Sequence, residues 1–245
     1  MKLQRQPWLD SLRGVAVVWM TAYHFAFDLN HFGWIHQDFY RAPVWTVQRT
    51  LILSLFLLCA GLGQSLAVAN GQSWRQFGRR WAQIAGCAVL VSVGSWFMFP
   101  NSWIYFGVLH GIAVMLLVCR LTACWGRWLW LAGALTLALW LAAPSLHAQW
   151  QPMGVFNAKF LSWVGLASTK PITEDYVPVL PWLAVMWWGM ALGQWLVRRD
   201  IPLVLPAAAL AVTRPLAWLG RWSLTWYVLH QPVLIGFLML VATLK

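Results

Sequence analysis

Long runs of apolar residues, separated by short polar stretches, recur along the whole chain. Each run holds about 20 residues, which at a rise of about 1.5 Å per residue lets a helix cross a hydrocarbon layer about 30 Å thick. The pattern therefore predicts an all-α, polytopic membrane protein, with about seven transmembrane helices forming one bundle over residues 1–245. The predicted spans are 13–31, 44–69, 80–99, 103–120, 128–144, 177–197 and 217–241.

Two segments between the predicted spans are longer than simple turns. The stretch 145–177 contains two prolines, two glycines and the acidic pair Glu174 and Asp175, and we expect it to form a partly helical cap over the outer face. The stretch 200–216 contains three prolines, so we expect it to lie at the inner interface rather than to cross the membrane. A crossing there would move the C-terminus to the inside. The prolines of this stretch are Pro202, Pro206 and Pro215.

Composition and charge support a membrane protein and fix its expected orientation. Hydrophobic residues make up 61% of the chain and charged residues only 9%, which excludes an ordinary soluble domain. The net charge of +11 does not call for a nucleic-acid partner, because the basic residues gather in loops on one side. By the positive-inside rule the N-terminus is cytoplasmic, the C-terminus extracytoplasmic, and the protein lies in the cell (inner) membrane. The expected inside residues are Lys2, Arg5, Arg13, Arg75, Arg79, Arg80, Arg120, Arg127, Arg198, Arg199, Arg214 and Arg221, against Arg41, Lys159, Lys170 and Lys245 outside.

Ionisable residues are rare inside the predicted spans, and the first span holds a stripe of them. Arg13 and His24 are eleven residues apart, so they differ by only about 20° around a helix axis. Asp28 lies one turn beyond His24, where it is expected to hydrogen-bond the imidazole. Asp10 completes the stripe at the inner end. Ionisable groups within a membrane are costly and usually face a cavity or a partner, so this stripe is a candidate site.

The depth of the other polar groups suggests a cluster. His24 lies about 16 Å from Arg13 along the helix, near mid-membrane. His110 is expected about 10 Å below the outer end of its span and His230 about 20 Å above the inner end of the last span, so all three histidines approach one level. Arg49, inside the second span, lies near the level of Asp28, and an ion pair between the two is expected.

Other interpretations of these residues remain open from the sequence. Each histidine could simply bond a neighbouring carbonyl, and Asp10 with Arg13 could be an orientation-setting pair at the inner interface. Three histidines at one depth could bind a metal, but their spacing does not support this and no metal is expected. A proton-linked carrier or scramblase with histidines along its route is an alternative function. A third is a quinone- or haem-binding protein with His110 and His230 as ligands.

The motifs also resemble a known family. The string "LDSLRGVAVVWMTAYHFAFDL" is similar to the opening helix of transmembrane acyltransferases, where an Asp-x-x-Arg-Gly element precedes a histidine at this spacing. Three further segments resemble small bacterial relatives of the heparan-α-glucosaminide N-acetyltransferase catalytic domain. The resemblance runs in order from Leu9 to about Leu234. Those segments are "FGVLHGIAV", "DYVPVLPWLAVMWWGMALG" and "LGRWSLTWYVLHQP".

The resemblance implies transfer of an acyl group, usually acetyl from acetyl-CoA, to a sugar on the opposite side of the membrane. By position, His24 would be the catalytic histidine and Arg13 would belong to the cytoplasmic donor region. In the heparan-modifying enzymes the catalytic histidine usually follows the first membrane helix, and His31 and His36 lie in that neighbourhood here. The implied partners are the lipid bilayer, acyl-CoA and an extracytoplasmic carbohydrate acceptor, and homo-oligomer formation is left open.

The residues can also be given roles in such a reaction on chemical grounds. A polyanionic nucleotide should stay at the basic inner face, and a neutral histidine can remove a proton from an attacking hydroxyl or amine, or become acylated transiently. The thioester oxyanion needs a hydrogen-bond donor. We therefore predict His24 and Asp28 as catalytic residues and Asp10, Arg13 and Arg221 as donor-binding residues. Candidates for substrate or oxyanion contact are Arg49, His110, Asp175, Ser223 and His230.

Overall fold

The computed structural model describes residues 6–201 and 207–244, and in these ranges the long elements are all helical. An isolated bridge joins Phe106 and Tyr176. The all-α prediction is therefore confirmed. Lys2, Arg5, Pro202, Pro206 and Lys245, to which the sequence assigned roles, lie outside the described residues. The elements are α1 (Pro7–His31), α2 (Pro43–Ala69), α3 (Trp74–Met98), α4 (Val108–Leu121), η1 (Ala123–Trp125), α5 (Trp128–Gln149), η2 (Gln151–Asn157), α6 (Lys159–Ser162), α7 (Val179–Arg198), α8 (Ala207–Arg221) and α9 (Ser223–Thr243).

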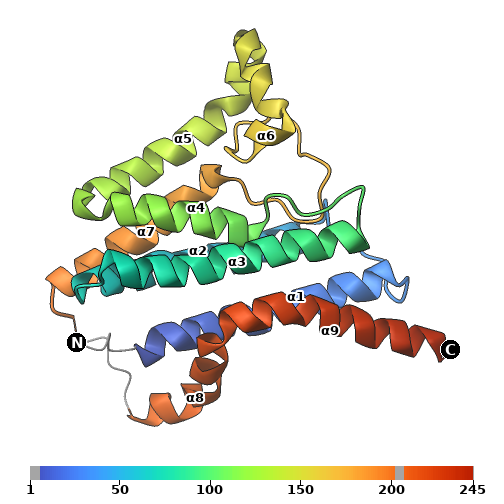
Figure 1. The fold of residues 1–245 in the computed structure, drawn as a ribbon, viewed down its shortest axis with the longest axis horizontal. Coiled ribbons are helices and arrows are strands. Elements are labelled where there is room, and N and C mark those ends of the chain that lie inside the picture. Colours follow the sequence, from blue (N-terminus) through green and yellow to red (C-terminus); the bar gives the residue numbers. More distant parts are fainter. Residues whose placement is uncertain (1–5, 202–206, 245) are drawn as a thin grey trace. The chain divides into compact units, whose positions relative to one another are not determined.

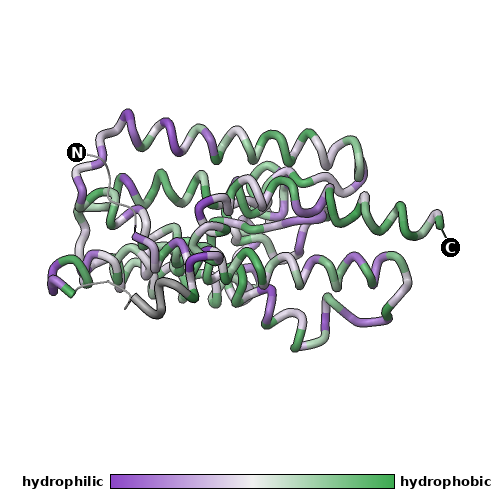
Figure 2. The backbone as a smooth tube through the Cα atoms, turned by 90° about the horizontal axis from the view of Figure 1, so that it is seen from below, coloured by the Kyte–Doolittle hydropathy of each residue, from purple (hydrophilic) through white to green (hydrophobic). Residues whose placement is uncertain are grey.

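Several of these helices have the length and composition of membrane spans. Within the described residues, α2, α3, α5 and α9 are long and apolar enough to cross a membrane, and α4 is a shorter apolar helix. Figure 2 colours each residue by its hydropathy, and the green of hydrophobic residues dominates along α9 toward the C-terminus. The chain is thus a helical protein of membrane type. Seven spans would require α1 and α7 to cross the membrane as well, and this stays a prediction.

Two of the predicted spans are not continuous helices. The span predicted from residue 103 begins as a helix only at Val108, because Gly107 before it has an extended backbone and the Asp175 carboxylate accepts a hydrogen bond from the Val108 N–H. The span predicted from residue 217 is divided, since α8 ends at Arg221 and α9 begins at Ser223. Trp222 between them has φ −101° and ψ 14°, which does not continue an α-helix.

The two longer connections contain more helix than their prolines suggest. Helix α8 passes through Pro215, and its 15 residues give a length of about 22 Å, short of the hydrocarbon thickness. Helix α5 passes through Pro144 to Gln149, so the first five residues of the expected cap belong to it. The rest of the cap contains η2 and α6. Whether either connection lies at a membrane interface stays a prediction.

The described chain divides into two compact units, of which one contains residues 57–201. In this unit α3 lies beside α4, and α7 packs against both α4 and α5 (Figure 1). The second half of α2 approaches α7 backbone to backbone: a Cβ on Gly61 would lie 2.1 Å from the Met186 carbonyl oxygen. Trp187 donates a hydrogen bond to Thr122 at 3.0 Å, which joins α7 to the end of α4.

The other unit contains, among the described residues, 6–56 and 207–244, with α1, the first half of α2, α8 and α9. Helix α8 crosses the first turns of α1 in close contact, because Gly14 and Gly220 present no side chain there. A Cβ on Gly220 would lie 1.8 Å from the Asp10 carbonyl oxygen, and one on Gly14 would lie 2.0 Å from that of Leu216. A hydrophobic cluster buries the other end of α1 against the loop before α2; its buried members are Met20, Tyr23, Phe39 and Ile52.

Candidate functional site

Helices α1 and α9 meet along a ladder of polar side chains. Near one end Trp226 Nε1 donates to Thr21 Oγ1 at 2.8 Å, and near the other Gln231 Nε2 donates to Asp28 Oδ1 at 3.3 Å. Between them the rings of His24 and His230 lie edge to face with centroids 5.1 Å apart. Residue numbers rise together on both helices, so α1 and α9 run in the same direction. The ladder places the first-span stripe against the last helix.

The imidazole of His230 is held in one tautomer by its own helix. Its Nδ1 lies 2.8 Å from the Tyr227 carbonyl oxygen and 3.2 Å from that of Trp226. A carbonyl oxygen only accepts, so Nδ1 carries the proton. The lone pair of the neutral ring is then on Nε2. The side chain is buried, with 6% of its surface exposed.

Four buried polar atoms of this ladder find no hydrogen-bond partner among the described residues. They are His24 Nδ1, Asp28 Oδ2, His230 Nε2 and Gln231 Oε1. A buried polar group left unpaired costs about 1–3 kcal/mol, so native proteins rarely keep several together without a reason. Their gathering where two helices face each other is the arrangement expected of a site that binds a polar group. We call these four residues the ladder cluster.

Two contacts expected from the sequence are not formed. Asp28 was expected to bond His24 one turn away, but its Oδ1 bonds Gln231 and its Oδ2 is unpaired. The expected ion pair between Asp28 and Arg49 is also absent among the described residues, where Arg49 is exposed. Both expectations relied on spacing along single helices, and α9 supplies the competing partner. Gln231 was overlooked in the sequence, although an amide next to His230 inside an apolar helix was a signal for it.

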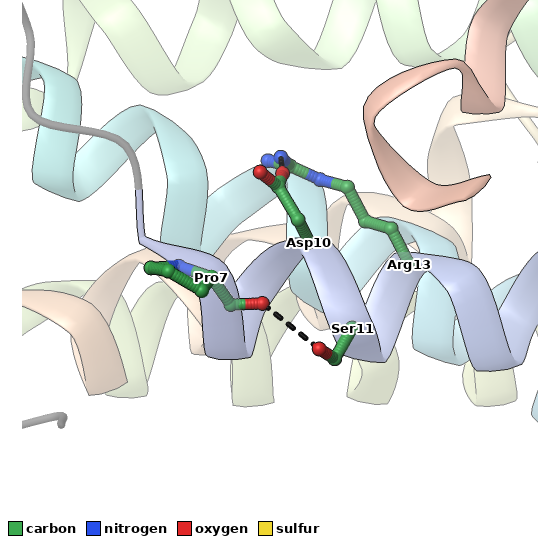
Figure 3. A network of polar contacts seen from close by, with 4 residues as sticks. All are labelled: Pro7, Asp10, Ser11 and Arg13. Atoms are coloured by element: carbon green, nitrogen blue, oxygen red, sulfur yellow. Dashed lines mark hydrogen bonds and ion pairs between the residues drawn. The ribbon is translucent and has the colours of Figure 1, made fainter. Parts of the chain in front are cut away.

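The predicted donor-binding residues gather at the other end of α1. Asp10 and Arg13 form an ion pair at 3.0 Å, and Figure 3 shows their side chains pointing toward each other. Arg221 follows directly after Gly220, which touches the Asp10 backbone, so its Cα lies beside the first turns of α1. Ser223 begins α9 two residues later. The structure therefore brings these four residues to one end of the unit.

Backbone contacts stabilise this end of α1. Ser11 Oγ donates to the Pro7 carbonyl oxygen at 2.9 Å, the bond drawn in Figure 3, and lies 3.4 Å from the Thr213 carbonyl oxygen of α8. Asp10 sits in the first turn of α1, where a carboxylate interacts favourably with the helix dipole. The carboxylate is thus satisfied by the helix and by Arg13. The Arg221 side chain is exposed and available to an anionic ligand.

His110 belongs to the unit of residues 57–201, where its ring holds the backbone in place. Its Nδ1 accepts a hydrogen bond from the Gly107 N–H at 3.3 Å, and its Nε2 lies 3.1 Å from Ser92 Oγ. Ser92 Oγ in turn donates to the Ile104 carbonyl oxygen at 2.6 Å. Both ring nitrogens are therefore engaged in holding the connection from α3 to α4. His110 also lies in the first turn of α4, rather than at the depth expected from a helix that begins at residue 103.

Asp175 likewise holds the chain in place. Its Oδ2 accepts from the Val108 N–H at 2.8 Å, so the carboxylate caps α4. Beside it, Tyr176 donates its hydroxyl to the Ser162 carbonyl oxygen at 2.6 Å, and burial raises the pKa of this phenol to about 12. Tyr105 bonds Ser162 Oγ at 2.5 Å. These contacts tie the segment before α7 to the segment before α4.

The comparisons with known proteins agree with the motifs. The family model described as heparan-alpha-glucosaminide N-acetyltransferase, catalytic, matches residues 5–232. No curated protein and no solved structure matches the chain. Among the described residues, no group of three or more His, Cys, Asp or Glu is placed to hold a metal ion.

Proposed function

The chain belongs to the heparan-α-glucosaminide N-acetyltransferase catalytic family, and on that premise we propose that it transfers acetyl from cytoplasmic acetyl-CoA to the hydroxyl or amine of an extracytoplasmic sugar. The observation that supports this activity best is the ladder cluster. Two histidines with unpaired ring nitrogens, buried beside a carboxylate, are suited to moving a proton. We assign His24 as the base because it also occupies the histidine position in the opening helix of transmembrane acyltransferases, which the first span resembles.

The inner end of α1 is suited to the acyl donor. The nucleotide of acetyl-CoA carries several phosphate charges, which favour arginine and are costly to bury without partners. Arg13 and the exposed Arg221 are two of the cations at the contact between α1 and α8. From Arg13 to His24 the distance along the helix is about 16 Å, which the slender arm of coenzyme A spans. The thioester would then lie beside the ladder cluster.

The proposed reaction balances with these groups alone. The acceptor oxygen or nitrogen attacks the thioester carbonyl, forming the new C–O or C–N bond while His24 removes the acceptor proton. The tetrahedral intermediate then collapses, the C–S bond breaks, and the proton passes from His24 to the departing thiolate of coenzyme A. Asp28 favours the positive imidazole through its charge, although it does not bond the ring.

Acetyl transfer by the purified full-length protein in liposomes tests this function. Radiolabelled acetyl-CoA and a panel of amino and neutral sugars are supplied on opposite sides. We expect labelled sugar from the wild type and a loss of about 100-fold or more for His24→Ala, with donor affinity nearly unchanged. His31→Ala and His36→Ala serve as matched controls, since both side chains are exposed.

Two results would contradict the proposal. Near-normal turnover by His24→Ala together with loss in either control would move the base to that residue. Failure of the wild type to hydrolyse or transfer acetyl-CoA with any acceptor would remove the activity itself. Each variant is compared at equal amounts of folded protein, so that loss of protein is not mistaken for loss of chemistry.

A further inference from the structure

We propose that His230 is a positioning residue for the reaction, and that its Nε2 is the acceptor that keeps a proton on Nδ1 of His24. This inference rests on the proposed function, because it matters only if His24 is the base. A base must present its lone pair to the proton of the sugar that it removes. The tautomer of a histidine is set by the hydrogen bond that its other ring nitrogen makes. With the proton on Nδ1, the lone pair of His24 is on Nε2.

The geometry supplies a suitable acceptor. The two carbonyl oxygens of Trp226 and Tyr227 hold the proton of His230 on Nδ1, so its Nε2 presents a lone pair. This atom and His24 Nδ1 are both buried and both unpaired. The two rings lie edge to face with centroids 5.1 Å apart. A hydrogen bond from the Nδ1–H of His24 to Nε2 of His230, made directly or through one water molecule, would satisfy both atoms.

The carboxylate on the same helix does not take this role. Asp28 lies one turn beyond His24, yet its Oδ1 accepts from Gln231 and no described bond joins it to the imidazole. The rings of Tyr23 and His24 are nearly perpendicular, with centroids 5.7 Å apart. Such a contact packs the ring without choosing a tautomer. Of the polar groups that contact His24, His230 is therefore the one with a fixed lone pair.

Two substitutions at His230 separate positioning from a structural role. A glutamine side chain places its amide near the site of Nε2, whereas an asparagine places its amide near the site of Nδ1. His230→Gln keeps an acceptor for His24, and His230→Asn keeps a donor for the carbonyl oxygens. We expect His230→Asn to lower kcat by about tenfold to 100-fold and His230→Gln to lower it several-fold less, with the KM for acetyl-CoA unchanged in both.

If His230 had only a structural role, His230→Asn would keep more turnover than His230→Gln, since asparagine retains the donor for the carbonyl oxygens of Trp226 and Tyr227. Equal turnover of the two variants, or higher turnover of His230→Asn, would overturn the proposal. Adding His230→Asn to His24→Ala should cause little further loss, because the two residues act as one unit. A full additional loss in the double variant would also contradict it. If His24→Ala is as active as the wild type, the base assignment fails instead, whatever the order at position 230.

A measurement of ring protonation in the wild type does not depend on turnover. Nitrogen chemical shifts of ¹⁵N-histidine in the reconstituted protein distinguish protonated from unprotonated ring nitrogens. The proposal expects His24 protonated at Nδ1 and His230 protonated at Nδ1 with Nε2 bare. Signals assigned by the single histidine variants identify each ring. A His24 ring protonated at Nε2 alone would refute the role of His230 even if both turnover variants at position 230 misfold.

Discussion

Asp28 of α1 bonds Gln231 of α9, with 3.3 Å between Oδ1 and Nε2, and leaves the imidazole one turn below it without a carboxylate partner. The carboxylate is 3% exposed, so its second oxygen is unpaired in a buried place. Asp28 therefore acts on His24 through the field of its charge and not through a hydrogen bond. For this reason, substitution of Asp28 should lower turnover less than removal of the base does.

We expect Asp28→Asn to lower kcat by no more than about tenfold, against about 100-fold or more for His24→Ala. The amide keeps the shape and one acceptor oxygen for Gln231 but removes the negative charge that favours a protonated imidazole. Single-turnover acetyl transfer measures the chemical step. A loss equal to that of His24→Ala would show that Asp28 takes part in proton transfer directly.

Arg13→Ala should raise the dissociation constant for acetyl-CoA by about tenfold, because a phosphate contact at the inner face is lost. Binding should also weaken with added salt, and less steeply in the variant. Since the substitution leaves Asp10 without its ion-pair partner, the double variant Asp10→Asn with Arg13→Ala separates that effect. The exposed Arg79 provides the control Arg79→Ala. Unchanged affinity in both Arg13 variants would remove Arg13 from the donor site.

The two ends of the chain should lie on opposite sides of the membrane. Helices α1 and α9 run in the same direction, so if both cross, the chain enters α1 and leaves α9 on opposite faces. Cysteines introduced as Lys2→Cys and Lys245→Cys, in a background where the exposed Cys124 is replaced by serine, report this by impermeant labelling. Lys245→Cys should label from outside and Lys2→Cys only after permeabilisation. Labelling of both from one side would contradict the odd number of crossings.

Gly220→Ala should destabilise the protein by about 1–3 kcal/mol, because its Cβ would lie 1.8 Å from the Asp10 carbonyl oxygen and the two helices would have to separate. The matched control is Gly236→Ala on α9, where a Cβ meets nothing within 4 Å. There alanine should be neutral or stabilise by up to about 1 kcal/mol. Thermal unfolding in detergent compares the two. Equal midpoints would mean that α8 does not pack on α1 this closely.

His110→Ala should reduce stability while leaving the turnover of folded protein near normal. The substitution removes the acceptor for the Gly107 N–H and a partner of Ser92, at a cost of about 1–3 kcal/mol. Unfolding and acetyl transfer, both normalised to folded protein, test this together. A large loss of turnover without loss of stability would instead support the oxyanion role that the sequence suggested for His110.

The sequence by itself determined the class of the protein and the positions of most helices. Apolar runs of spanning length can bury their backbone polar groups in lipid only as helices or closed barrels, so the all-α expectation followed from segment length and periodicity. The same reasoning placed Arg13, His24 and Asp28 on one stripe, because 3.6 residues per turn fix which residues share a face. It also gave the family, through motifs that lie in order along the chain.

Tertiary structure decided which partners these residues have. Spacing could place Asp28 within reach of His24, but only the packing of α9 against α1 shows that Gln231 takes the carboxylate and that His230 faces the imidazole. Likewise, His110 resembled the other histidines in sequence until its contacts with Gly107 and Ser92 gave it a structural role. Periodicity describes the faces of one helix at a time. Hydrogen bonds between helices depend on which faces meet. Here those faces belong to segments some 200 positions apart in the chain, so spacing within one helix does not predict their contact.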